Sequence, residues 1–178
     1  MKALIIIDMQ REMQRRLEAG RNCVNGEAPD RIAALASAFR QKGLRVVHVR
    51  HRDDDPRSSM HADAAGYPPM ACAEALDGEA VFIKRTSSAF ASTDLEAHLR
   101  KEGIGELVVT GAVAGFCVNS TVRAGADLGF AMTVVRDAVV GFDLPDAGLS
   151  AQVIFDVTMA HLEADFARII DTSEAMAV

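Results

Sequence analysis

Residues 108–123 read VVTGAVAGFCVNSTVR, an apolar strand that runs through a glycine-containing turn into a helical pattern. The pattern places Cys117 at the N-terminus of that helix, where unpaired backbone N–H groups and the helix dipole favour a thiolate over a thiol. The same N–H groups can stabilise an oxyanion as it develops. Cys117 is therefore a candidate nucleophile, and the alternative is a small buried cysteine that fills a gap in the core.

Two further apolar strands end in residues that can support such chemistry. Residues 3–8 read ALIIID and end in Asp8, and residues 80–84 read AVFIK and end in Lys84. In a parallel α/β sheet, ligands bind outside the carboxyl ends of the strands, so Asp8, Lys84 and Cys117 should face one crevice. Asp8 can accept the thiol proton, Lys84 can stabilise both anions, and the thiolate can attack a carbonyl. The alternatives are a cap for Asp8 and a solvated strand end for Lys84.

Strands and helical patterns alternate along the whole chain, which predicts one α/β domain over residues 1–178 with a mostly parallel sheet. The six expected strands cover residues 3–8, 45–50, 80–84, 106–110, 132–136 and 167–171. Expected helices run over about 29–43, 93–103, 117–129 and 145–163. The helix after Pro29 has apolar residues at the spacing that buries one face.

The composition restricts the class of protein. The chain has 178 residues, of which 49% are hydrophobic and 25% are charged, as expected for a globular domain. Its net charge of −6 argues against nucleic acid as a partner. A signal peptide and a membrane-spanning run of about 18 apolar residues are not expected, so we expect no membrane partner. The scattered cysteines Cys23, Cys72 and Cys117 indicate neither a disulfide framework nor a zinc site, which favours the cytoplasm.

The sequence motifs at these three strand ends resemble those of the isochorismatase-like cysteine hydrolases. This family includes nicotinamidases, N-carbamoylsarcosine amidase, ureidoacrylate amidohydrolase and isochorismatases. The matching segments are LIIIDMQ at 4–10, KRTSSAF at 84–90 and TGAVAGFCV at 110–118, in an order and spacing that cover nearly the whole chain. The resemblance implies a catalytic triad of Asp8, Lys84 and Cys117. Together with right-handed crossovers, it predicts a three-layer α/β/α fold with a six-stranded sheet in the order 3-2-1-4-5-6.

The resemblance implies further features of the site and of the assembly. It implies a non-proline cis peptide bond between Val113 and Ala114, which in the family turns the N–H at the Ala114 position towards the oxyanion, alongside that of Cys117. It also implies a homodimer or a larger homo-oligomer that acts on a small molecule. No cofactor is expected. In the predicted strand order the Lys84 strand lies two strands, or about 10 Å, from the Asp8 strand, so Lys84 must lean inward.

Substrate contacts are expected around this triad and in the long segment 50–79, which we interpret as a lid or pocket wall. Many relatives have Asn-Asp-Phe after the first motif, where this chain has Arg11-Glu12-Met13, so Met13 suggests a different pocket wall. Relatives often have Thr-Asp where this chain has Ala114-Gly115. The candidate substrate-binding residues are Met13, Arg50, His51, Tyr67, Phe90, Val113 and Phe116.

Two differences between this chain and members of the family narrow the type of reaction that we expect. Nicotinamidases carry a metal-holding Asp-x-His pair after the second strand, but here Val49 stands where that Asp would be, so no metal site of this type is expected. His51, Asp53 and His61 are a weaker alternative for a metal. Isochorismate-cleaving members generally have Asp in place of the cysteine, so Cys117 favours C–N hydrolysis.

The sequence therefore predicts a metal-independent amidohydrolase that cleaves a C–N bond of a small amide, ureido or carbamoyl compound through a thioester. Two alternatives stay open at this point. One is a non-hydrolytic ligand-binding protein or thiol sensor with the same crevice. The other is a vinyl-ether hydrolase of the isochorismate type.

Overall fold

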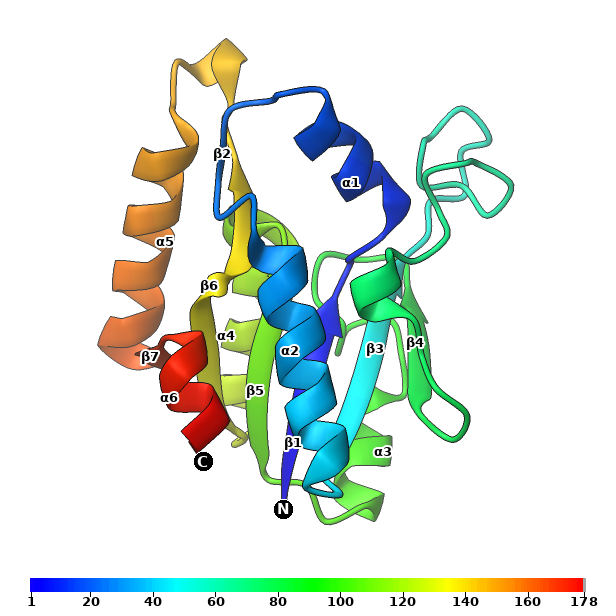
Figure 1. Cartoon of the computed structure of the whole chain (residues 1–178), viewed down its shortest axis with the longest axis vertical. Coiled ribbons are helices and arrows are strands. Elements are labelled where there is room, and N and C mark those ends of the chain that lie inside the picture. The colour runs from blue at the N-terminus through cyan, green and yellow to red at the C-terminus, as the bar shows by residue number, and fades with distance from the viewer. Residues whose placement is uncertain (178) are drawn as a thin grey trace.

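A computed structural model describes residues 1–177 (Figure 1). Its strands are β1 (Lys2–Ile7), β2 (Cys23–Val24), β3 (Arg45–His51), β4 (Ala80–Lys84), β5 (Glu106–Ala112), β6 (Ala131–Phe142) and β7 (Arg168–Ile170). Its helices are α1 (Arg11–Glu18), α2 (Ala28–Gln41), α3 (Leu95–Lys101), α4 (Asn119–Asp127), α5 (Ala151–Asp165) and α6 (Thr172–Ala177). Three short helical turns, η1 (Ala71–Ala73), η2 (Ala114–Val118) and η3 (Pro145–Ala147), complete the described elements.

The strands form one sheet in the order β4-β3-β1-β5-β6, with β2 and β7 both paired to β6. The pairing of β2 with β6 is antiparallel, whereas the other pairs are parallel. The parallel strands thus follow the predicted neighbour order, but the predicted count of six is wrong, because the described residues form seven strands. The additional strand, β2, has only two residues and gives no period-two pattern in the sequence.

Helices cover both faces of this sheet and make a three-layer arrangement (Figure 1). On β1, the side chains of Ala3, Ile5 and Ile7 pack towards α3, α4 and α5. Those of Leu4 and Ile6 pack towards α2 and α6 on the other face. A strand that alternates in this way between two apolar layers reads as a continuous apolar run, which is why β1 is visible in the sequence.

The sequence analysis predicted helix α2 but missed helices α1 and α6. In α2 the predicted apolar positions are all buried, and the helix ends just before Gly43, which has the left-handed φ of 67°. Helix α1, REMQRRLE, has only two apolar residues, Met13 and Leu17, and two positions are too few to predict a helix from their spacing. Helix α6 is six residues long and buries Ala175.

The ends of β1 and β5 are shaped by two unusual backbone positions. Gly111 pairs with Ile7 at a φ of 120°, and a Cβ atom there would overlap the Ile7 backbone. Asp8 has a left-handed φ of 51°, which turns the chain as β1 ends. The cis peptide bond joins Ala112 to Val113, so the predicted position between Val113 and Ala114 is wrong. Strand β5 continues to Ala112, two residues beyond its predicted end at residue 110.

Within residues 1–177, every helix is too short or too polar to cross a membrane.

Candidate active site

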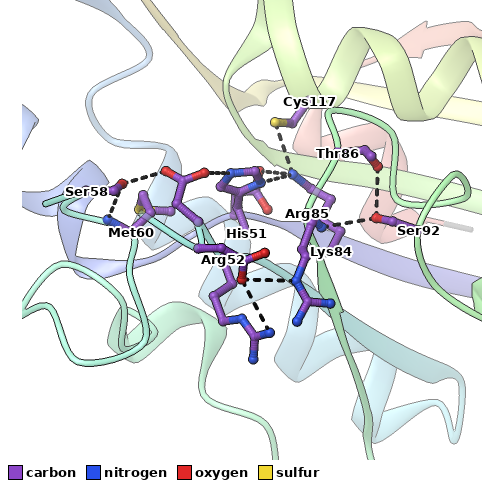
Figure 2. Close-up of polar contacts among 12 residues, drawn as sticks. His51, Arg52, Ser58, Met60, Lys84, Arg85, Thr86, Ser92 and Cys117 are labelled. Carbon is purple, nitrogen blue, oxygen red and sulfur yellow. Dashed lines mark hydrogen bonds and ion pairs between the residues drawn. The ribbon is translucent and has the colours of Figure 1, made fainter. Parts of the chain in front are cut away.

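Asp8, Lys84 and Cys117 meet at the carboxyl ends of β1, β4 and β5, as Figure 2 shows for Lys84 and Cys117. The Lys84 Nζ atom lies 2.8 Å from Asp8 Oδ2 and donates a hydrogen bond to Cys117 Sγ at 3.1 Å. Lys84 is fully buried, and its extended side chain crosses the end of β3 to reach both partners. The ammonium group therefore links the carboxylate to the thiol.

Burial controls the protonation of this group of side chains. Desolvation raises the pKa of Asp8 above its ordinary value, although the ion pair with Lys84 opposes the shift. Burial, together with the nearby Asp8 carboxylate, raises the pKa of Cys117 to about 12. This shift opposes the effect of the helix N-terminus, so the expected preference of Cys117 for the thiolate form stays a prediction. Desolvation outweighs the favourable effect of Lys84, which the sequence pattern could not reveal.

Asp8 has an oxygen available to take the thiol proton. Its Oδ2 atom is paired with Lys84, whereas its buried Oδ1 atom receives no hydrogen bond from an N–H or hydroxyl group within residues 1–177, and the carboxylate lies within hydrogen-bonding reach of the Cys117 thiol. Cys117 is close enough for the Asp8 charge to raise the pKa of its thiol. A buried acceptor without an N–H or hydroxyl donor is costly in a protein interior, and it is suited to a general base.

Cys117 lies in η2, a π-helical turn between β5 and α4. The Val113 carbonyl accepts hydrogen bonds from the N–H groups of Phe116, at 3.0 Å, and Val118, at 3.4 Å. These two donors are therefore occupied, and they differ from the predicted oxyanion donors, Ala114 and Cys117. Ala114 is fully buried, whereas Cys117 is partly exposed, as a nucleophile that meets a substrate must be.

A third group contacts Lys84 from the end of β3. His51 Nδ1 lies 3.2 Å from Lys84 Nζ, and His51 Nε2 lies 2.8 Å from Asp53 Oδ1. Ser58 donates a hydrogen bond from its hydroxyl to Asp53 Oδ2 at 2.5 Å (Figure 2). His51 was predicted to contact substrate, but its contact with Lys84 and the role of Asp53 were not anticipated.

Gln10 holds the segment after β3 against the site, and sequence analysis gave it no role. Its side chain is fully buried, donates to the carbonyls of His51 and Tyr67, and accepts from the His51 N–H at 2.8 Å. Backbone hydrogen bonds from Arg11 to Pro68 and from Met70 to Met9 extend this attachment. The part of the segment around Tyr67 is therefore fixed to the end of β1. In the sequence, the only indication of this role was a polar residue, Gln10, directly after a buried strand.

The remaining predicted substrate contacts lie in different environments. Phe116 is 50% exposed beside Cys117, and Val113 is partly buried against the α2 side of the core. Phe90 stacks on Phe130 with ring centroids 5.7 Å apart and packs in the core on the α4 side. Met13 is buried in the core on the α2 side.

Arg50 does not join the Lys84 group. Neighbouring residues of a strand point to opposite faces, so Arg50 lies on the face opposite His51 and on the same face as His48. Its positive charge contributes to the lowered pKa of His48, although burial of His48 is the main cause. Within residues 1–177, no three His, Cys, Asp or Glu side chains are grouped closely enough to hold a metal ion.

Comparisons with known proteins identify the family and agree with the fold. The family model described as Isochorismatase domain matches residues 2–173. An uncharacterized isochorismatase family protein of Bacillus subtilis, YrdC, is 31% identical over 97% of this chain and 93% of its own length. The crystal structure of a putative hydrolase of the isochorismatase family from Chromobacterium violaceum superposes with a TM-score of 0.92 and is 32% identical, covering 99% of this chain and 92% of that one.

One relative is named for the reaction that it catalyses. Ureidoacrylate amidohydrolase RutB of Methylorubrum extorquens is 29% identical in an alignment that covers 76% of this chain and 68% of that protein. The family model spans nearly all of the chain, and the strand-end motifs that carried the resemblance meet at one site in the structure. This chain therefore belongs to the isochorismatase family of hydrolases.

Proposed function

We propose that this protein is a metal-independent cysteine amidohydrolase that cleaves a C–N bond of a small amide, ureido or carbamoyl compound. One observation carries the proposal: a single buried ammonium group, Lys84 Nζ, is within hydrogen-bond distance of both Asp8 and Cys117. The similarity to ureidoacrylate amidohydrolase supports the choice of a C–N bond. A cysteine at the reacting position supports nucleophilic attack over the acid chemistry of vinyl-ether cleavage.

The first half of the reaction forms a thioester. Asp8 Oδ1 takes the proton from Cys117 as the sulfur attacks the substrate carbonyl, and Lys84 balances the charge near both groups. The backbone N–H groups of Ala114 and Cys117 stabilise the oxyanion. Asp8 then gives its proton to the leaving nitrogen, the C–N bond breaks, and the amine or ammonia departs.

The second half releases the acid. Asp8, again a carboxylate, takes a proton from a water molecule as that water attacks the thioester carbonyl. The tetrahedral intermediate collapses, the C–S bond breaks, and the sulfur recovers the proton from Asp8. The raised pKa of Asp8 suits this exchange, because an acid–base catalyst works best when its pKa is close to the working pH.

The high pKa of Cys117 does not favour the alternative of a thiol sensor. Sensor cysteines react with oxidants as thiolates and are usually easily ionised. A hydrolase tolerates a protonated resting thiol, because the base removes the proton only when a carbonyl is in place. The contacts of Lys84 with both Asp8 and Cys117, and the direction of the pKa shift at Cys117, therefore support the hydrolase over the sensor.

The proposal is tested with a panel of small primary amides, N-carbamoyl compounds and ureido acids, with release of ammonia or amine as the signal. The wild-type protein should turn over at least one class, and Cys117→Ala should abolish turnover while the circular dichroism spectrum is unchanged. Cys72→Ala, which removes a thiol outside the site, should retain full activity. Turnover by Cys117→Ala would refute the assignment of the nucleophile.

We also propose that the protein acts in the cytoplasm as a homodimer or a larger homo-oligomer. Its three cysteines are free, which suits a reducing compartment. Phe116, Leu149, Val153 and Val157 are between 43% and 51% exposed, and the two valines lie one turn apart on α5. Exposed apolar side chains gathered in one region are typical of surfaces that subunits bury.

A further inference from the structure

We propose that His51 and Asp53 are positioning residues that hold the Lys84 ammonium in the direction of Asp8 and Cys117. The inference rests on the proposed function for its catalytic meaning, but it is argued from contacts that do not depend on the substrate. Figure 2 shows the chain of contacts from Ser58 through His51 to Lys84 and Cys117.

Lys84 has as many contacts as it has protons to donate. An ammonium group carries three N–H donors and no acceptor. The three partners of Lys84 Nζ are Asp8 Oδ2 at 2.8 Å, Cys117 Sγ at 3.1 Å and His51 Nδ1 at 3.2 Å. Because Lys84 is fully buried, no donor can be satisfied by bulk water instead. Without an acceptor at His51, the third N–H group would be unpaired, and the ammonium could rotate away from the thiol.

The contact with Lys84 determines which ring nitrogen of His51 carries the proton. Since Lys84 can only donate, His51 Nδ1 must be the acceptor, and the ring proton must sit on Nε2. Nε2 is the atom that lies 2.8 Å from Asp53 Oδ1, so it donates to that carboxylate. A doubly protonated His51 would point its Nδ1–H donor at the ammonium group of Lys84, which has no acceptor. The contacts therefore select the neutral Nε2–H form of the ring.

Asp53 is itself held in place. The Ser58 hydroxyl donates to Asp53 Oδ2 at 2.5 Å, and the Ser58 oxygen accepts from the Met60 N–H at 3.1 Å. The hydrogen bonds from Ser58 and His51 keep the pKa of Asp53 below its ordinary value, so Asp53 is a carboxylate at neutral pH. The segment that follows β3 thereby acts on the nucleophile through His51 and Lys84, and not by touching the thiol.

The charged and titratable groups around His51 come from several elements. Lys84 approaches from β4, Asp8 from β1 and Cys117 from η2, and Asp53 follows in the chain. Among these groups only Asp53 contacts Nε2. Asp53 is thus the group that can hold the ring in the required form.

The experiment measures the rate constant for alkylation of Cys117 by iodoacetamide from pH 7 to pH 10, with the labelled site confirmed by mass spectrometry. This readout needs no substrate. His51→Ala should slow alkylation at a given pH about tenfold, because a poorly directed Lys84 stabilises the thiolate less. Asp53→Ala should slow it by a similar or smaller factor. Asp53→Asn keeps an acceptor oxygen and should recover most of the rate.

The decisive comparison is the double variant His51→Ala/Asp53→Ala. If Asp53 acts only through His51, the double variant should alkylate no more slowly than His51→Ala alone. Losses that multiply, or rates unchanged in the single variants, would overturn the inference. Asp55→Ala is the matched control, since Asp55 lies in the same segment and its carboxylate binds Arg57. If His51→Ala does not fold, His51→Gln replaces it.

A second readout separates this inference from the proposed reaction. In ¹⁵N-histidine NMR spectra, the His51 signal, assigned from its loss in His51→Gln, should show the neutral Nε2–H form. An Nδ1–H form would overturn the inference even in an active enzyme. Conversely, an inactive protein that shows the Nε2–H form and the non-multiplying alkylation losses would refute only the hydrolase.

Discussion

At the scale of a single residue, Asp8 has two tasks in the proposed mechanism: one oxygen pairs with Lys84, and the other is available to take the thiol proton. Burial raises its pKa, so the carboxylate form that accepts a proton is lost at a higher pH than for an ordinary aspartate. We expect kcat/KM to increase as the pH rises through this pKa. Asp8→Asn should lower kcat about 10²–10⁴-fold and remove that limb of the pH profile.

The control for Asp8→Asn is stability. Removing one member of a buried ion pair is destabilising, so thermal unfolding must show that the variant is folded at the assay temperature. A folded Asp8→Asn protein with wild-type kcat would contradict the role of Asp8 as the base.

Gly111 shows how one residue limits the approach of two strands. A methyl group at this position would overlap the Ile7 backbone, and the φ of 120° is one that side chains rarely allow. We expect Gly111→Ala to lower the free energy of unfolding by more than about 3 kcal/mol, measured by urea denaturation.

Gly103 provides the matched control for this substitution. It also has a positive φ, of 65°, but a Cβ atom there would meet nothing within 4 Å. Gly103→Ala should therefore cost only about 1 kcal/mol, which is the strain of the backbone alone. Equal costs at the two positions would show that the approach of β5 to β1 is not what requires Gly111.

At the scale of elements, Glu79 joins α2 and β3 to the start of β4. It accepts hydrogen bonds from Arg40 at 2.7 Å and 2.9 Å, from His48 at 2.9 Å and from the Leu76 N–H at 2.9 Å. Burial opposes its ionisation, but these bonds outweigh that effect and lower the pKa of Glu79 to about 2. The carboxylate therefore stabilises the folded state wherever it is ionised.

We expect the stabilisation from Glu79 to depend on pH in one direction. Because its pKa is lower in the folded protein than the ordinary 4.5, the contribution is complete above pH 4.5 and is lost as the pH falls towards 2. Glu79→Gln should destabilise the protein by on the order of 2 kcal/mol at pH 7 and by less at pH 3. Urea denaturation at both pH values checks this, with exposed Glu106→Gln as control. A loss of stability in Glu79→Gln that is larger at pH 3 than at pH 7 would contradict this prediction.

The elements that sequence analysis found, and those it missed, differ in how strongly burial marks them. Strands such as β1, with apolar residues on both faces, and helices such as α2, with one apolar face, are visible as patterns. Helix α1 has only two apolar residues and strand β2 is only 2 residues long, so neither offers enough positions to show a pattern.

The site was predictable to a similar degree. Strand ends predicted that Asp8, Lys84 and Cys117 would meet, because parallel strands end at the same edge of a sheet. The contacts of Gln10, His51 and Asp53 could not be predicted, because they depend on how the irregular segment after β3 folds back. The desolvation that raises the pKa of Cys117 was also not visible in the sequence, because it is a property of the whole packed site.

At the scale of the whole molecule, the exposed apolar side chains on η2 and α5 should lie between two copies of the chain. We expect light scattering to report at least a dimer, and Val157→Glu to shift the mass to that of a monomer, because a buried charge without a partner is costly. Leu76→Glu, at another exposed apolar position, should leave the assembly intact. A monomeric wild-type protein would contradict the proposal.

The three side chains of the proposed reaction are separated by long stretches of chain, and each lies at or just beyond the carboxyl end of a different strand. The site exists only when β1, β4 and β5 have all taken their places in the sheet. Such distant pairings are slow to form compared with helices. After dilution from denaturant, turnover should therefore recover more slowly than the helical circular dichroism signal. Activity would then measure completion of the sheet during refolding.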